Sequence, residues 1–227
     1  MENLFVVLTS GSNRSGIESS KISWLDEEDH IVLGDVTIPE LNFIGFSNDS
    51  GTSHKLNYRL YDFLRYYSDL FSDYDWITFI DDTSYVFKDK LNKELEINYG
   101  TRIPRLIGND QITRFDYFNN NHMWEDDSKQ MIFNIKTGIS VNNTFLSKSK
   151  ELFDSFTKKD KSTFLQDTML DDRFFSVLSK SIDAKNHISS SRVYINLCKD
   201  IEENFDYYCL VGGLNAIDKI FIMENTA

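Results

Sequence analysis

Two adjacent carboxylates, Asp81 and Asp82, directly follow an apolar run at residues 76–80. The run is aromatic and β-branched, which predicts a buried strand, and such a strand has no structural use for two unpaired charges. Ligand crevices in open α/β sheets lie just beyond the carboxyl ends of the strands. The two acids could therefore hold a metal ion or a sugar hydroxyl there. The alternative is a solvated turn, because Asp, Thr and Ser all favour turns.

The elements around this pair predict an α/β fold. Apolar residues recur at helical spacing over residues 54–71, which predicts an amphipathic helix leading into the strand. Further strands are expected at residues 4–8, 31–33 and 42–46, with a helix between the first two. Alternating strands and helices are typical of α/β domains.

Composition limits the classes of protein to which the chain can belong. With 227 residues, 41% hydrophobic and 14% aromatic, it is long enough for one domain with a substantial core. We therefore expect a single domain over residues 1–227. The formal charge of −12 opposes general affinity for nucleic acid or anionic lipid, because phosphates are held chiefly by Lys and Arg.

The chain shows no signal for membrane insertion or export. The apolar run near the N-terminus follows an acidic residue and has no basic flank, and no window approaches the ~20 apolar residues of a membrane span. Cys198 and Cys209 are expected to be free thiols of a reducing compartment. We therefore expect a soluble, cytoplasmic protein.

Residues 47–87 resemble the Fringe-like β-1,3-glycosyltransferases. In that family a helix leads to a strand that begins with Trp, and the strand ends in three acids followed, one residue later, by Tyr-Val. Trp76, Asp81, Asp82 and the Tyr85-Val86 pair fall on this pattern. The resemblance implies one GT-A-like domain with a mixed central β-sheet flanked by helices. Its nucleotide-binding part would span about residues 1–90 and its acceptor side about residues 91–227.

The resemblance also implies a function. The chain would move a sugar from a nucleotide sugar, most simply a UDP-sugar, to a hydroxyl of a glycan or glycoprotein, with inversion. Asp81 would contact the ribose or donor sugar, and Asp82 would bind the diphosphate through Mn²⁺ or Mg²⁺, with both acids near the metal ion. The family's usual metal ligand is the last Asp of the triplet. Thr83 stands at that position, so the resemblance implies a weakened metal site.

Two residues nearer the N-terminus complete the implied nucleotide side. A Ser15-x-x-Glu18 capping box predicts a helix start, where Arg14 and backbone N–H groups suit a phosphate. In the family a basic residue and a Trp follow the first strand, as Arg14 and Trp24 do here. Asp35 falls where the family often carries an acid near the nucleotide's base. The alternatives are a surface charge for Arg14 and a turn residue for Asp35.

The second half of the chain supplies weaker matches. The sequence predicts a strand that runs into Thr137-Gly138, which resembles the start of a Thr-Gly-Gly-Ala-Gly motif that lies close to the donor sugar. The stretch from residue 98 to 127 has no clear periodicity, and such stretches are commonly functional or mobile. Trp124 within it could stack on an acceptor sugar or anchor its own loop to the core.

Asp167 matches the Asp that acts as catalytic base in the family, before a helix. We expect Asp167 near the start of that helix, where a negative charge is favoured. Asp171 or Asp172, one turn later, could take its place. A helix-stabilising acid without chemistry is the alternative. The His that completes the family's metal site is missing, because Asn196 lies in that neighbourhood and His187 lies earlier.

Two rival functions follow from the departures from the pattern. Thr83 and the missing His favour a GT-A-like domain that binds a sugar or nucleotide without catalysis. A phosphotransferase with an Asp-x-Asp nucleophile loop fails, because the residue two positions after Asp81 is Thr83. The sequence also has no phosphate-binding G-x-x-x-x-G-K-[ST] loop and no G-x-S-x-G motif.

Overall fold

A computed structural model describes residues 1–9, 14–26, 28–34, 43–45, 56–100, 102–109, 133–168, 173–194 and 207–226. Six residues named above lie outside these ranges: Asp35, Trp124, Asp171, Asp172, Asn196 and Cys198. Within the described residues, no helix is both long enough and apolar enough to cross a bilayer.

The described strands form one large sheet and one small sheet. The large sheet has the order β3-β2-β1-β4-β7-β6-β8. Its strands are β1 (Asn3–Leu8), β2 (His30–Gly34), β3 (Phe43–Gly45), β4 (Trp76–Asp81), β6 (Arg105–Gly108), β7 (Ile139–Asn142) and β8 (Lys185–Ile188). The run from β3 to β4 is parallel, β7 is antiparallel to both of its neighbours, and β6 and β8 are parallel. The sheet is therefore mixed.

The small sheet has the order β5-β10-β9, from β5 (Tyr85–Val86), β10 (Leu210–Gly212) and β9 (Arg192–Tyr194). Its middle strand pairs antiparallel with β5, which directly follows the acidic pair, and parallel with β9. The chain's C-terminal part is thereby joined to the turn after β4.

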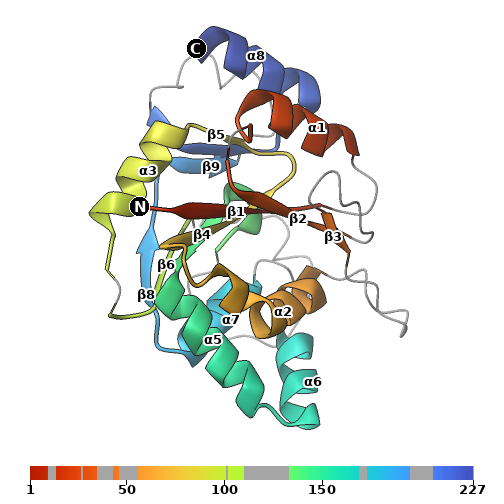
Figure 1. Cartoon of the computed structure of the whole chain (residues 1–227), viewed down its shortest axis with the longest axis vertical. Helices are drawn as coiled ribbons and strands as arrows, with labels where there is room; N and C mark the ends of the chain where they lie inside the picture. Colours follow the sequence, from red (N-terminus) through yellow and green to blue (C-terminus); the bar gives the residue numbers. More distant parts are fainter. Residues whose placement is uncertain are drawn as a thin grey trace, which may run out of the picture.

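Helices cover both faces of the large sheet (Figure 1). One face carries α2 (Leu56–Tyr66), α5 (Asn143–Ser155), α6 (Lys158–Asp167) and α7 (Phe174–Ser181). The other carries α1 (Arg14–Ser23), α3 (Lys88–Ile97), α8 (Ala216–Thr226) and the small sheet. Alternate residues of β1 divide between the two cores: Leu4, Val6 and Leu8 pack on the first side, and Phe5 and Val7 on the second. This is the period-two alternation of a sheet buried on both faces.

The predicted fold class is confirmed, with a mixed sheet between helices in a single α/β domain. The four predicted strands appear as β1 to β4. The strand expected before Thr137-Gly138 is wrong, because β7 follows Gly138 instead. The Asn134 side chain accepts a hydrogen bond from the Lys136 backbone N–H at 2.9 Å and folds Ile135–Thr137 into a 3₁₀ turn, η3. Strand β6 also lies within the stretch that showed no periodicity.

Candidate functional site

The acidic pair lies where the strand order of the large sheet reverses. From β1 the chain moves outward to β2 and β3, and then returns to the other side of β1 as β4 (Figure 1). The carboxyl ends of β1 and β4 are therefore adjacent, and Leu8 is paired with Asp81. In open α/β sheets, ligands bind outside the carboxyl ends of the strands at such a reversal. Sequence position and topology thus select the same place for a site.

Asp82 is held between the ends of the two strands. Its backbone N–H donates to the Leu8 carbonyl at 3.0 Å, and its Oδ2 accepts a hydrogen bond from Thr9 Oγ1 at 2.6 Å. Its side chain is buried, with only 4% of the residue's surface exposed. An ionised carboxylate is stable in such a position only with partners. Asp82 thus ties β4 to β1 at the reversal point.

Asp81 is the more accessible acid, and it shapes the turn. Its Oδ1 accepts hydrogen bonds from both the backbone N–H and the hydroxyl of Thr83, at 3.0 and 2.6 Å. A side-chain oxygen that bonds the backbone two residues on defines an Asx turn. Thr83 is bound in turn by the segment after β10, because Gly213 N–H donates to its hydroxyl at 3.2 Å and Leu214 N–H donates to its carbonyl at 2.7 Å. The position that differs from the family pattern therefore joins the turn to the C-terminal part.

Two buried cations flank the reversal point from opposite faces of the sheet. Arg59 on α2 donates to the Thr9 carbonyl at 2.8 Å. Lys219 on α8 donates to Ser20 Oγ at 2.7 Å, to the Gly16 carbonyl at 3.1 Å and to the Asp82 carbonyl. Lys219 is fully buried and Arg59 is 4% exposed. In a chain with a net charge of −12, these cations concentrate positive charge beside the acidic turn.

Burial controls the titration of Lys219. It lowers the pKa of the ammonium from 10.5 to about 8, against the opposing influence of the Asp82 and Asp81 carboxylates, which raise it. The group is still mostly protonated at pH 7. The protein thus keeps a costly buried charge next to the acidic pair.

The Lys136-to-Gly138 segment lies beside the acidic turn. Ser84 Oγ donates to the Lys136 carbonyl at 3.3 Å, and Phe79 is paired with Ile139, which brings Gly138 next to the end of β4. Gly138 has φ of 75° and a Cβ there would lie 2.4 Å from Leu210 Cδ1. Glycine is therefore required here by the backbone conformation and by β10. Thr137 is buried, and its hydroxyl donates to the Asn134 carbonyl at 2.8 Å.

A buried ion pair supports this segment from behind. Arg192 on β9 contacts Glu94 on α3, with its Nη2 2.7 Å from Oε2, and also donates to the Gly138 carbonyl at 3.1 Å. Burial alone would raise the pKa of Glu94, but the charge of Arg192 and hydrogen bonds from Ser189, Arg192 and Ser191 lower it overall. The nearby thiol of Cys209 is free, and burial raises its pKa. This network fixes the backbone next to the candidate site.

The expected position of Asp167 within its helix is wrong, since it is the last residue of α6 and exposed. The helix begins earlier because Thr157 and Asp160 form a complete capping box at its N-terminus. The helix dipole disfavours a negative charge at a helix C-terminus, so Asp167 does not stabilise α6 in the way proposed for an acid at a helix start. Near that end of α6, the Leu165 carbonyl accepts a hydrogen bond from Asn57 near the start of α2. The helix that carries Arg59 thus links the end of α6 to the site.

Sequence reasoning missed several residues of the site: Thr9, Arg59, Lys219, Gly212 and Gly213. Gly212 has a detectable signal, because a Gly-Gly pair after an apolar run indicates close backbone approach. A Cβ on Gly212 would lie 2.1 Å from the Lys136 carbonyl oxygen. Arg14 is the first residue of α1, so the predicted helix is present, but it begins two residues earlier than a Ser15 cap predicts and Ser15 lies within it.

The described residues do not contain a group of three or more His, Cys, Asp or Glu side chains that could hold a metal ion. The oxygen ligands that remain are those of Asp81 and Asp82, and one oxygen of each is already hydrogen-bonded to a threonine. Mg²⁺ is commonly bound by one or two carboxylates, with waters and substrate phosphates as the other ligands. The pair fits an ion of that kind.

Comparison with known proteins identifies the fold. No protein-family model matches the sequence, and no curated protein does. Among solved structures, the chain is similar to a glycosyltransferase involved in the glycosylation of the major capsid of PBCV-1, with a TM-score of 0.52 and 11% identity over 99% of this chain and 100% of that one. It is also similar to mouse xyloside xylosyltransferase 1, with a TM-score of 0.52 and 11% identity over 93% and 97% of the two chains. The fold is therefore of the GT-A type found in nucleotide-diphospho-sugar transferases.

Proposed function

We propose that the chain is a glycosyltransferase of the Fringe-like, hexosyltransferase type. It transfers a sugar from a nucleotide sugar, most simply a UDP-sugar, to a hydroxyl of a glycan or glycoprotein, with inversion. The observation that carries this proposal is the Asp81–Asp82–Thr83 turn at the strand reversal between β1 and β4. That is the ligand position of open α/β sheets, in a fold shared with known glycosyltransferases.

The donor would lie over this turn. Asp81 is the partly exposed acid, so it contacts the ribose or donor sugar and reaches the metal ion first. Asp82 is held by Thr9, so it acts mainly by fixing the turn and by adding negative charge near the ion. Thr137 and Gly138, which immediately precede β7, border the donor sugar. The nucleotide part, about residues 1–90, thus uses groups from the second half of the chain.

The leaving diphosphate needs its charge offset. A divalent cation, Mn²⁺ or Mg²⁺, would neutralise the diphosphate as it departs. The chain's own contribution is the fixed positive charge of Lys219 and Arg59, which are held in place by backbone carbonyls near the turn. Groups that are already positioned need no reorganisation during the reaction. Arg14 begins α1, and the free backbone N–H groups at the N-terminus of that helix would also suit a phosphate.

The acceptor hydroxyl needs a proton acceptor. We assign this role to Asp167, which is exposed at the end of α6. A carboxylate within hydrogen-bond reach of the hydroxyl takes its proton as the oxygen attacks the anomeric carbon. One carboxylate that acts as base gives a single displacement, and the product is then inverted.

The experiment is a donor screen. The protein is incubated with a panel of UDP-sugars and Mn²⁺, and released UDP and product configuration are measured. We expect UDP release above the spontaneous rate with at least one donor, abolished in Asp81→Asn. A matched variant, Asp154→Asn, changes an exposed acid that is paired with Arg65 and Lys150, and it should retain the activity. Equal release by wild type and Asp81→Asn would contradict the proposal.

A second candidate is a GT-A-like domain that binds a sugar or nucleotide without catalysis. It is favoured by Thr83 at the usual metal-ligand position and by Asn196 in the neighbourhood where the family carries a His. This candidate predicts UDP binding without UDP release from any donor. The donor screen combined with a UDP titration separates the two functions.

A further inference from the structure

The other end of the large sheet carries a cavity that the proposed reaction does not use. A cavity of about 380 Å³ is lined by Tyr99, Gly100, Arg102, Ile103 and Arg105. Arg105 begins β6, and the next residue, Leu106, is paired with Val141 near the end of β7. The end of β7 is in turn paired with the start of β4, where Asn142 lies opposite Trp76. The acidic turn lies at the opposite end of β4. The cavity is therefore a separate place on the molecule.

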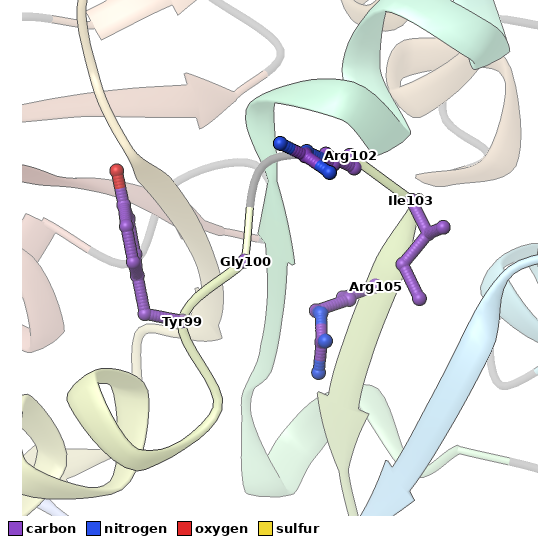
Figure 2. A pocket seen from close by; sticks show the side chains of 5 residues that line it. All are labelled: Tyr99, Gly100, Arg102, Ile103 and Arg105. Carbon is purple, nitrogen blue, oxygen red and sulfur yellow. The ribbon is translucent and has the colours of Figure 1, made fainter.

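Two guanidinium groups line this cavity, and no carboxylate of the described residues pairs with either of them. Figure 2 shows the side chains of Arg102 and Arg105 on the side of Gly100, with Ile103 extending the other way. Within the described residues neither arginine forms an ion pair, whereas Arg65 and Arg192 contact Asp154 and Glu94. In a chain with 36 acids and 24 basic residues, unpaired arginines at one cavity stand out.

Arg105 also carries an unsatisfied donor. Its Nε is buried and has no hydrogen-bond acceptor within the described structure. Gly100 lets the guanidinium lie close to the backbone, because a Cβ at Gly100 would lie 3.0 Å from both Nε and Nη2. A buried donor without an acceptor costs free energy. A ligand that supplies an acceptor removes this cost, so its hydrogen bond to Nε adds more to the binding free energy than a bond to a donor that already has an acceptor.

The segment that holds the arginines is fixed before any ligand arrives. The Asn142 side chain donates to the Gly100 and Ile103 carbonyls at 2.7 and 2.9 Å and accepts from the Arg105 backbone N–H at 2.9 Å. Asn142 is itself 3% exposed and caps α5. Such a support lowers the entropic cost of binding, because the backbone of Gly100, Ile103 and Arg105 is already held in place.

We propose that this cavity binds a small tetrahedral oxyanion, a phosphate or sulfate group, through Arg102 and Arg105. The planar donor fork of arginine matches such oxygens. The ligand is small because Asp75 and Glu96 line the adjacent cavity, which shares Tyr99, and would repel an extended polyanion. The exposed rings and alkyl groups of Tyr99 and Ile103 offer a surface for an organic group that carries the oxyanion.

The test is an NMR titration of the ¹⁵N-labelled protein at constant ionic strength, with inorganic phosphate in one arm and phenyl phosphate in the other. We expect saturable shifts of the amides around residues 99–105 and of the arginine Nε–H signals. Arg102→Met and Arg105→Met should each weaken binding by about tenfold or more, since hydrogen bonds to charged groups are involved. Tighter binding of phenyl phosphate would indicate an esterified ligand, and equal binding would indicate the free anion.

Arg65→Met is the matched control, because Arg65 is a partly exposed arginine already paired with Asp154. Its affinity for phosphate should equal that of the wild type. Arg102 is exposed, so its substitution keeps the test valid if Arg105→Met fails to fold. Unsaturable shifts, shifts confined to residues 81–84, or unchanged affinity in Arg102→Met would each overturn the proposal. UDP binding by Arg102→Met should be unaffected, so this test is independent of the glycosyltransferase assignment.

Discussion

Replacing Lys219 by Met tests whether a buried charge is kept beside the acidic turn. Methionine has nearly the same length and fills the same space without a charge or a donor. In the wild type the ammonium is fully buried and donates to Ser20, Gly16 and Asp82. The variant therefore removes the charge and changes the volume little.

The magnitude follows from the pKa of Lys219. Burial lowers this pKa to about 8 from the ordinary 10.5. The unfolded chain binds more protons than the folded chain between these values, so the free energy of unfolding rises with pH across this window. The penalty for the buried charge is fully present below pH 8 and fades as pH approaches 10.5. At 1.36 kcal/mol per pKa unit, its change from pH 7 to pH 10 is about 2.5 kcal/mol.

The assay is urea denaturation of both proteins at pH 7 and pH 10. All other titrating groups are common to the two proteins, so the difference between their unfolding free energies isolates Lys219. We expect the wild type to gain about 2.5 kcal/mol relative to Lys219→Met over this range. A relative change below about 0.5 kcal/mol would mean that Lys219 titrates near its ordinary pKa, and the reasoning would fail.

The same variant tests the proposed role of the charge. The UDP affinity of the wild type should fall as pH rises through 8, whereas that of Lys219→Met should be lower at pH 7 and independent of pH in this range. Equal UDP affinities at pH 7 would show that the Lys219 charge does not act on the diphosphate.

Three further outcomes are expected. Thr83→Asp should tighten Mn²⁺ binding by calorimetry, because it adds a charge at the turn; unchanged affinity would place residue 83 away from the ion. Asp167→Asn should lower transfer by about 10²-fold or more with nearly unchanged donor affinity, as expected for loss of a general base, while exposed Glu151→Gln has no effect; normal turnover of Asp167→Asn would refute its role. Glu94→Gln should lower the unfolding free energy by about 3–5 kcal/mol, because it leaves Arg192 buried without its counter-charge. A loss below about 1 kcal/mol in urea denaturation would contradict the structural role of that pair.

The large sheet could be predicted from sequence because its central strands carry their own signal. β1 and β4 are six residues long, apolar and buried, so their pattern is unambiguous. β5, β9 and β10 have two or three residues each, which is too few for a period to show. Residues 191–198 do have an apolar pattern that predicts a strand, and β9 lies within them. The pairing that joins β5, β9 and β10 into one sheet connects distant segments, and no local pattern predicts it.

The candidate site was predictable where acids follow a strong strand and where the Thr137-Gly138 pair matches a family motif. Asp81 and Asp82 fall in the first class. Lys219 falls in neither, because a lysine in a short helix is typically a solvated residue, and only the packing of α8 against α1 buries it. Asp167 was placed wrongly because the capping box at Thr157 was not recognised as the helix start. Residues brought in by tertiary packing were missed for the same physical reason as the short strands.

Binding of the donor at the turn between β1 and β4 is best tested by a UDP titration. UDP is titrated by calorimetry into the wild type, Asp81→Asn and the control Asp154→Asn, each with Mn²⁺ and with EDTA. We expect the wild type and the control to bind UDP, with weaker binding when EDTA removes the ion, and we expect Asp81→Asn to lose affinity by about tenfold or more. Metal-independent binding with the same affinity in all three proteins would contradict donor binding at this turn.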